Sequence, residues 1–226
     1  MSYAFSSAPQ CLADLIPQRT FLGTSLILRR DGRLLYGLRP PHAEGVRTIV
    51  DVTGIGGALE PEDGSPAAGA RREAQEETGC AVRLAACRET VVIRGAGQVQ
   101  VLELQGEERP AAVVYRRHPT PPHQPWHPDA RGQACVIVFA ADLEGEPWPA
   151  AELPGLVWLT PAQVVDLACR DVPLAGVLDS EARLVERQGN ILPRDSWARL
   201  TNSQEALTLG LTDNALRFLQ LLLWPC

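Results

Sequence analysis

The chain has 226 residues, of which 45% are hydrophobic and 5% aromatic, and its formal net charge is -6. This length allows one domain with a sizeable core, or one domain plus an extension. Nucleic-acid-binding domains usually carry a basic patch, so the acidic balance argues against a nucleic-acid partner. All 21 basic residues are arginine. Local recognition of phosphate is therefore still possible, because a guanidinium makes bidentate contacts with it.

The cysteines and the apolar runs indicate an intracellular protein. The six cysteines are scattered and form no Cys-x-x-Cys pair, which favours free thiols over a disulfide framework. Residues 1–19 lack the basic start and the sustained apolar stretch of a signal peptide. The longest apolar run, at 219–224, is far too short for a membrane span. We therefore predict a soluble, cytoplasmic protein without a membrane partner.

The first part of the chain predicts strands followed by a helix. Asp31-Gly32 is a strong two-residue hairpin signal between two apolar runs. Ser65-Pro66 suits the start of a helix, and Gly79 supplies the left-handed residue that ends it after Thr78. The strands expected in this part are 20–30, 33–39 and 48–53.

The second part predicts more strands and then helices. A loop dense in proline and histidine, 116–132, interrupts the strands, and Thr160 caps a helix over 161–169. From about residue 171 the pattern is helical and ends in a Leu-rich helix at 214–223. The strands expected here are 82–93, 98–104, 112–115, 135–141 and 156–159. The chain thus predicts an α/β (mixed α+β) fold with a segment at 1–19, a domain at 20–170 and a helical extension at 171–226 packed on that domain.

Three carboxylates on the first helix carry the strongest chemical signal. Residues three and four apart share a helix face, so Glu73, Glu76 and Glu77 form one acidic cluster within a single turn. Like charges at this spacing destabilise a bare helix. A divalent cation that prefers oxygen ligands removes the repulsion, and Mg²⁺ is the usual choice where substrate phosphates complete its shell.

The loop before this helix contains residues suited to support the cluster. Gly56 and Gly57 allow a tight turn that brings backbone close to the carboxylates. Arg72 precedes the cluster and is expected to orient an acid from the loop, either Glu60 or Asp63.

The segment from Gly57 to Cys80 resembles the signature of the Nudix hydrolase family. The second half matches in full, through Arg72, Glu73, Ala74, Glu76, Glu77, Gly79 and Cys80. In the first half the expected Glu falls on Asp63, and eight residues rather than seven separate it from Arg72. One extra residue in the loop explains the difference, and Glu60 or Glu62 is the alternative loop acid.

The resemblance implies an α/β/α sandwich with a mixed sheet and a metal-dependent hydrolase. It implies Mg²⁺ or Mn²⁺ between Glu73, Glu76, Glu77 and a diphosphate linkage of a nucleoside diphosphate derivative. Glu73 or Glu76 would act as general base, and Arg72 belongs to the same catalytic group. Similar enzymes recruit a further acid outside the motif, for which Glu144 and Glu146 are candidates, as are Glu107 and Glu108. Such proteins often dimerise, so a homodimer is possible.

Two other functions compete with hydrolysis. A non-catalytic nucleotide-sensing module on the same scaffold would have a degenerate motif, whereas the three glutamates are intact. An isoprenoid-diphosphate isomerase would need a reactive cysteine, for which Cys87 and Cys135 are available. His118, His123, His127 and Trp126 in the Pro-rich loop are expected to be a solvated surface. The alternatives are a transition-metal site or a substrate-covering loop in which Trp126 stacks on a base. The substrate stays open, because its recognition depends on loops.

Overall fold

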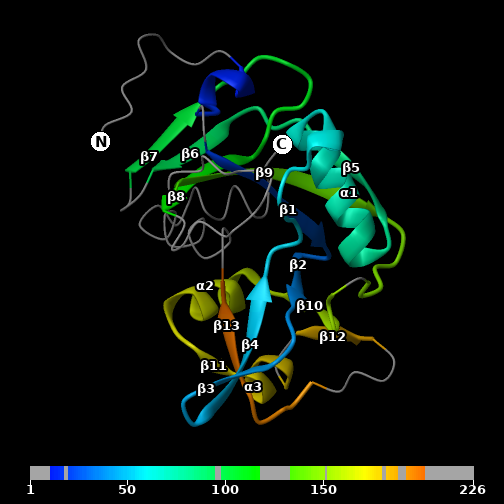
Figure 1. Ribbon diagram of the computed structural model, residues 1–226. Coiled ribbons are helices and arrows are strands. Elements are labelled where there is room, and N and C mark those ends of the chain that lie inside the picture. The colour runs from blue at the N-terminus through cyan, green and yellow to red at the C-terminus, as the bar shows by residue number, and fades with distance from the viewer. Residues whose placement is uncertain are drawn as a thin grey trace.

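The computed structural model describes residues 11–17, 20–94, 98–117, 133–150, 152–179, 182–187 and 192–201 (Figure 1). The helix predicted at 214–223 and the His-rich part of the predicted loop lie outside these residues. The helices are α1 (Pro66–Thr78), α2 (Pro161–Cys169) and α3 (Leu174–Leu178), with short 3₁₀ turns η1 (Leu12–Leu15) and η2 (Pro61–Asp63). The strands are β1 (Phe21–Arg30), β2 (Arg33–Leu38), β3 (His42–Glu44), β4 (Arg47–Thr53), β5 (Ala81–Ala85), β6 (Thr90–Arg94), β7 (Gln98–Leu102), β8 (Ala112–Arg117), β9 (Gln133–Glu144), β10 (Gly155–Leu159), β11 (Val172–Pro173), β12 (Arg183–Glu186) and β13 (Trp197–Leu200).

The strands form one mixed sheet that is built around β1. This strand pairs in parallel with β9 and, at its end, antiparallel with β2 through the Asp31-Gly32 turn. The principal strand order is β11-β13-β4-β2-β1-β9-β8-β6-β7, and β10, β12, β3 and β5 join it as side branches. Figure 1 shows β5 to β9 with α1 in the upper half, and β2, β4, β10 and β13 with α2 and α3 in the lower half.

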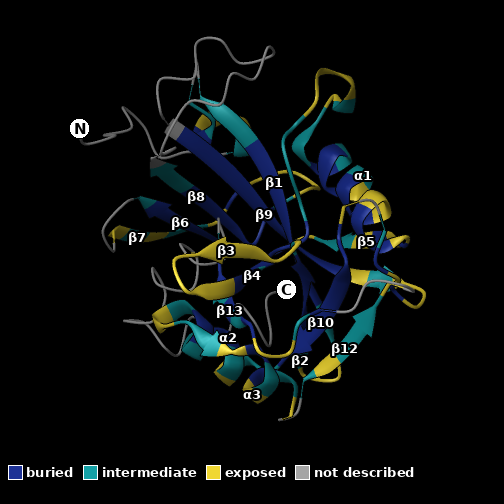
Figure 2. Ribbon diagram, turned by 60° about the horizontal axis from the view of Figure 1, so that its bottom comes forward, coloured by how far each residue is buried: buried dark blue, intermediate teal, exposed yellow. Residues whose placement is uncertain are grey.

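Helices cover the sheet from both sides, over two hydrophobic cores. Successive residues of β9 alternate between the cores: Ile137 and Phe139 pack on the side of α1, and Val136 and Val138 on the side of α2 and α3. This alternation follows from the two-residue period of a strand. Figure 2 shows β1, β8 and β9 buried at the centre. The predicted mixed α/β fold with helices on the sheet is confirmed.

The small residues of α1 explain how closely the helix lies on the sheet. Ala67, Ala70 and Ala74 are each at most 1% exposed and belong to the core on that side, which also contains Leu26 and Ile137. Short side chains let the helix backbone approach β1 and β5. Glu73 and Glu77 each follow one of these alanines by three residues, so they lie close to the same face of the helix and are nearly buried.

Two sequence predictions need correction. The run 82–93 is not one strand, because β5 pairs with β9 whereas β6 pairs with β7 and β8. The helical pattern expected from residue 171 onward holds for 174–178, which form α3, but is wrong for 172–173, 183–186 and 197–200, which are strands. These strands are β11, β12 and β13, and β13 extends the sheet by pairing in parallel with β4.

The cysteines and the membrane prediction can be compared with the described residues. Cys11, Cys80, Cys135 and Cys169 are free thiols. The expectation of free thiols is wrong for Cys87, which is disulfide-bonded. In the described part of the chain, no helix has the length and apolar character needed to cross a membrane.

Candidate metal-binding site

Helix α1 carries the acidic residues and is capped at both ends as its sequence predicts. The Ser65 hydroxyl accepts a hydrogen bond from the Ala68 N–H at 3.1 Å, and Pro66 occupies the first turn. Gly79 has a φ of 66° and donates its N–H to the Gln75 carbonyl, so it ends the helix in the left-handed conformation. These caps fix where the carboxylates lie along the helix axis.

A loop before α1 runs along the edge of β1 and brings backbone to the carboxylates. The Thr24 N–H donates to the Gly57 carbonyl at 2.9 Å, and the Leu26 N–H donates to the Ile55 carbonyl at 2.8 Å. A Cβ at Gly57 would lie 2.5 Å from Glu73 Oε1. Any larger residue there would require the Glu73 carboxylate to shift, so the predicted close approach of this backbone to the acidic cluster is present.

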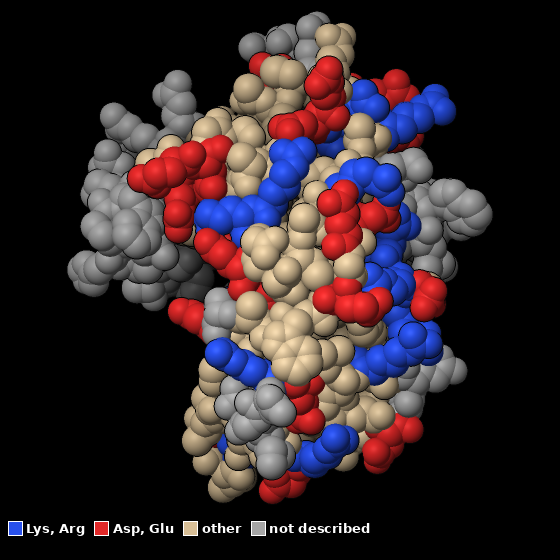
Figure 3. All heavy atoms as spheres, turned by 90° about the vertical axis from the view of Figure 1, so that its right-hand side faces the viewer, with Lys and Arg blue, Asp and Glu red and all other residues tan. Residues whose placement is uncertain are grey.

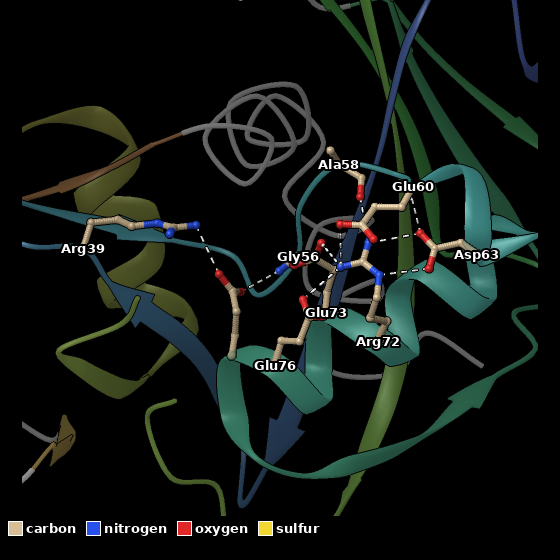
Figure 4. Close-up of polar contacts among 9 residues, drawn as sticks. Arg39, Gly56, Ala58, Glu60, Asp63, Arg72, Glu73 and Glu76 are labelled. Atoms are coloured by element: carbon tan, nitrogen blue, oxygen red, sulfur yellow. Dashed lines mark hydrogen bonds and ion pairs between the residues drawn. The ribbon is translucent and has the colours of Figure 1, made fainter. Parts of the chain in front are cut away.

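Arg72 links the loop to the helix. Its Nε and Nη2 donate to the two carboxylate oxygens of Asp63 at 2.9 and 3.0 Å, and Nη2 also donates to the Ala58 carbonyl at 2.9 Å (Figure 4). Its Nη1 lies 2.9 Å from both Glu73 Oε1 and Glu76 Oε2. The guanidinium thus orders the loop and two acids of the motif together.

The structure shows which loop acid Arg72 contacts. Asp63 makes the bidentate pair, whereas Glu60 Oε1 lies 3.8 Å from Arg72 Nη1. The Arg72 guanidinium holds the pKa of the Asp63 carboxyl below its usual range, mainly through these hydrogen bonds. Asp63 is the last residue of η2, and Gly64, which follows it, has a φ of 69°.

Replacement of Asp63 by Asn should disorder this loop. The variant loses one charged partner of the bidentate pair, and hydrogen bonds to charged groups contribute about 1.5–3 kcal/mol, so we expect a loss of roughly 2 kcal/mol in the free energy of unfolding. Urea denaturation measures this loss. Glu62→Gln, at an exposed position of the same turn, is the matched control and should change stability by less than about 0.5 kcal/mol. Equal stability of the two variants would contradict the role given to Asp63.

Glu77 lies apart from the Arg72 contacts and faces the other side of the loop. Its Oε2 accepts a hydrogen bond from the Gly56 N–H at 2.9 Å, and its Oε1 lies 3.1 Å from Arg39 Nη2 (Figure 4). The side chain is 8% exposed. Burial raises the pKa of this carboxyl to about 7, although the Gly56 N–H and Arg39 oppose the shift. Glu77 is therefore an acid whose charge is poorly solvated.

The three motif glutamates are brought together in part. Glu73 and Glu76 meet at Arg72, and Glu77 turns toward Arg39. Across the ranges that the structure describes, no three His, Cys, Asp or Glu side chains are grouped as a ready-made metal site. Charge coupling nevertheless connects the two halves, because Glu73 contributes to the raised pKa of Glu77. One helical turn thus carries three acids that contact two arginines, and each arginine also contacts an acid from outside the helix.

The donor set fits Mg²⁺ or Mn²⁺. All donors are carboxylate oxygens, the type that these hard cations prefer. Glu73 fills the space that a Cβ at Gly57 would occupy, and it is nearly buried like Glu77. Burial raises the pKa of Glu73 as well. A cation beside these two side chains would stabilise their charged forms, so the residues present suit such an ion.

The raised pKa of Glu77 predicts how the stability of the metal-free protein depends on pH. A carboxyl whose pKa is higher in the folded than in the unfolded state stabilises the fold below the unfolded value, and this contribution is lost as pH rises through the folded value. Between pH 4.5 and about 7, the free energy of unfolding of the wild type should fall by roughly 2–4 kcal/mol relative to that of Glu77→Gln. Urea denaturation in EDTA at several pH values measures it. A constant difference between the two proteins would contradict the prediction.

The acids expected outside the motif lie elsewhere. Glu146 is 90% exposed and pairs with Arg30 at 2.7 Å. Glu144 is exposed at the end of β9, where it pairs in register with Ala81. Among the described residues, neither acid is one of those that contact Arg72 or Arg39. Glu107 and Glu108 are exposed, and Glu108 pairs with Arg71.

Two residues near the site were missed by sequence reasoning. Arg39 follows β2 directly and reaches Glu77 from there, and Glu152, in the loop between β9 and β10, lies 3.5 Å from Arg39 Nη1. Figure 3, which views the side of the molecule where α1 lies in Figure 1, shows acidic and basic side chains interleaved over this face. The only local signal for Arg39 was its place between an apolar strand and Pro40-Pro41.

Comparison with known proteins identifies the family. The family model for the NUDIX domain matches residues 21–179, and the chain therefore belongs to this family. The match extends past residue 170, where the sequence placed the end of the domain, to the end of α3. Membership supports pyrophosphohydrolase activity in general terms. No curated protein gives a significant match.

Solved structures of related proteins are similar at low sequence identity. The E. coli ORF135 protein is 17% identical, with a TM-score of 0.39, and the alignment covers 65% of this chain and 78% of that one. A NUDIX hydrolase from Nitrosomonas europaea is 13% identical, with a TM-score of 0.42 and coverage of 71% and 84%. A MutT NUDIX hydrolase from Burkholderia pseudomallei is 18% identical, with a TM-score of 0.38 and coverage of 63% and 84%.

Proposed function

We propose that this protein hydrolyses a diphosphate linkage in a nucleoside diphosphate derivative and depends on Mg²⁺ or Mn²⁺ to do so. The observation that supports the proposal most directly is the pair of nearly buried glutamates, Glu73 and Glu77, held one turn apart against the Gly56-Gly57 backbone. Poorly solvated acids need compensating charge, and in the metal-free protein each of these two acids pairs with one arginine, Glu73 with Arg72 and Glu77 with Arg39. A divalent ion carried by a diphosphate would add positive charge at the same carboxylates, and carboxylate oxygens are the ligands that such an ion prefers.

Each residue of the site has a role in this proposal. Glu73, Glu76 and Glu77 would hold the ion, which supplies charge stabilisation on phosphoryl oxygens and a lower pKa for an attacking water. Arg72 keeps Glu73 and Glu76 oriented through the pair with Asp63. The Glu76 side chain is 51% exposed, whereas that of Glu73 is 11% exposed. Water therefore has easier access to Glu76, which favours it over Glu73 as the general base.

The alternative functions receive less support. A sensing module that only binds a nucleotide has no need for three intact glutamates with a positioning arginine. An isomerase would need a thiolate near the substrate, but Cys135 is fully buried in β9. Burial raises the pKa of its thiol to about 12, and a thiol with such a pKa is a poor nucleophile at neutral pH.

A substrate panel tests the proposal. The purified protein is incubated with ADP-ribose, nucleotide sugars, dinucleoside polyphosphates and oxidised nucleoside triphosphates, each with Mg²⁺, Mn²⁺ or EDTA. Product masses are then measured. We expect cleavage of a diphosphate linkage in at least one class, and only when a cation is present. Unchanged substrates across the whole panel, or cleavage that persists in EDTA, would count against the proposal.

A further inference from the structure

Arg39 connects three separate parts of the chain. Its backbone N–H donates to the Asp51 carbonyl of β4 at 2.9 Å, which fixes the position of its Cα. Its Nη2 lies 3.1 Å from Glu77 Oε1, and its Nη1 lies 3.5 Å from Glu152 Oε2. Figure 4 shows the guanidinium reaching toward α1 from the side opposite Arg72. The side chain of Arg39 thus bridges one nearly buried acid and one exposed acid.

The contact of Arg39 with Glu77 is much more important than its contact with Glu152. Glu152 is 85% exposed and separated from Arg39 by a long contact, so this pair contributes little to stability. Glu77 is 8% exposed, and within the described residues its Oε1 contacts Arg39 and its Oε2 accepts from the Gly56 N–H. A nearly buried carboxylate without a cationic partner destabilises a protein strongly. Arg39 therefore neutralises Glu77.

This position of Arg39 conflicts with a divalent cation on the same carboxylate. The guanidinium contacts Glu77 Oε1 directly, and two cations within a few ångströms of each other repel strongly near a protein interior. An ion that binds Glu77 through Oε1 therefore competes with the guanidinium for that oxygen. Glu152, on the exposed side of Arg39, is an acid that the displaced guanidinium can still contact.

We propose that Arg39 is a built-in counter-ion of the metal ligand Glu77, which holds that carboxylate in the metal-free protein and is displaced when a divalent cation binds. The inference rests on the proposed function, because it takes Glu77 as a metal ligand. Arg39 is in this view a positioning residue. Its contact with Glu77 joins the end of β2 to α1 in the metal-free protein, and this contact is broken in the metal-bound protein.

Thermodynamic linkage predicts that replacing Arg39 changes protein stability and Mn²⁺ affinity in opposite directions. A residue that stabilises only the metal-free state opposes metal binding by the same free energy. Arg39→Gln should therefore unfold at a lower temperature than the wild type in EDTA, and yet bind Mn²⁺ more tightly. The difference in unfolding temperature should become smaller at saturating Mn²⁺. A residue with a purely structural role would lower the unfolding temperature in both conditions and leave Mn²⁺ affinity unchanged.

The experiment measures free Mn²⁺ by electron paramagnetic resonance and unfolding by calorimetry. For Arg39→Gln we expect at least about fivefold tighter Mn²⁺ binding, the lower end of typical coupling between two sites. Arg83→Gln is the matched control. It removes the same charge from an exposed pair with Asp142, and its Mn²⁺ affinity should stay within about twofold of the wild type. Unchanged or weaker binding by Arg39→Gln would overturn the inference.

A second variant tests the role of Glu152 as a partner for the displaced guanidinium. Glu152→Gln removes the acid that the Arg39 guanidinium can contact after it leaves Glu77. The guanidinium should then be harder to displace, so Mn²⁺ should bind more weakly than in the wild type. The same change in the Arg39→Gln background should have a smaller effect, because only the direct charge interaction of Glu152 with Glu77 then remains. Equal effects in the two backgrounds would overturn this step.

The same titrations keep the inference separate from the proposed function. A wild type that binds Mn²⁺ no better than Glu77→Gln does would contradict the metal site itself. Loss of Mn²⁺ binding in Glu77→Gln together with unchanged binding in Arg39→Gln would contradict only the role of Arg39.

Discussion

Glu77→Gln should abolish cation-dependent hydrolysis while the protein stays folded. Glutamine is isosteric with glutamate and can still accept the hydrogen bond from the Gly56 N–H, but it lacks the negative charge that a divalent ion requires. Loss of a metal ligand removes several kcal/mol of transition-state stabilisation. We expect kcat to fall by about a thousandfold, which corresponds to roughly 4 kcal/mol. Steady-state kinetics on the best substrate of the panel, with Mg²⁺ and with Mn²⁺, measures the loss.

A matched control separates the charge of Glu77 from acidic charge in general. Glu103→Gln removes one negative charge at an exposed position, where the acid lies 3.8 Å from Arg88. Its kcat should stay within about twofold of the wild type, because surface charges are screened. Circular dichroism should show Glu77→Gln to be folded. Wild-type turnover by a folded Glu77→Gln protein would refute the assignment of Glu77 as a metal ligand.

Gly56→Ala should destabilise the protein more than any other single replacement in the loop before α1. Gly56 has a φ of 145°, and a Cβ there would lie 2.2 Å from the Thr24 carbonyl oxygen and 2.7 Å from the Ser25 Cα. Both neighbours are backbone of β1, at the centre of the sheet, and cannot move aside. Backbone strain of this kind combined with a steric clash should lower the free energy of unfolding by about 3–5 kcal/mol. Urea denaturation measures the loss.

Gly106→Ala is the control for the backbone conformation alone. Gly106 also has a positive φ, 110°, but a Cβ added there would meet no other atom within 4 Å among the residues that the structure describes. Its replacement should cost about 1–2 kcal/mol through the unfavourable φ. The difference between the two variants then reports the clash with β1. Similar losses in both variants would show that the loop can move away from β1.

Local sequence signals predicted the elements around the site well. Asp31 and Gly32 have φ values of 51° and 71°, as a tight hairpin turn requires. Ser65 and Gly79 set the two ends of α1, and Thr160 caps α2. Each of these predictions depends on residues that interact with near neighbours along the chain, so the sequence contains the whole interaction.

The predictions that failed depend on distant partners. The strand β13 pairs with β4, which lies far away along the chain. The short runs at 172–173 and 183–186 also become strands because their partners, β13 and β10, are in place. Neither run has a clear period of its own. The run at 82–93 looked continuous because both of its halves are apolar, although the two halves have different partners in the sheet.

The same distinction applies to the site. The order of Arg72, Glu73, Glu76 and Glu77 was visible in the sequence, and so was the need for a loop acid, but the choice of Asp63 over Glu60 depends on the shape of η2. Arg39 and Glu152 could not be found from local patterns, because their link to Glu77 arises only when β2 and the loop after β9 fold against α1.

The loop after β9 has a consequence for the order in which the protein assembles during synthesis. The Trp148 N–H donates to the Thr78 carbonyl, and the Ala150 N–H donates to the Glu77 carbonyl. On the ribosome, the last turn of α1 therefore emerges long before these two donors are made. The acidic turn can reach its final geometry only after β9 has left the exit tunnel and the loop behind it has closed over the helix.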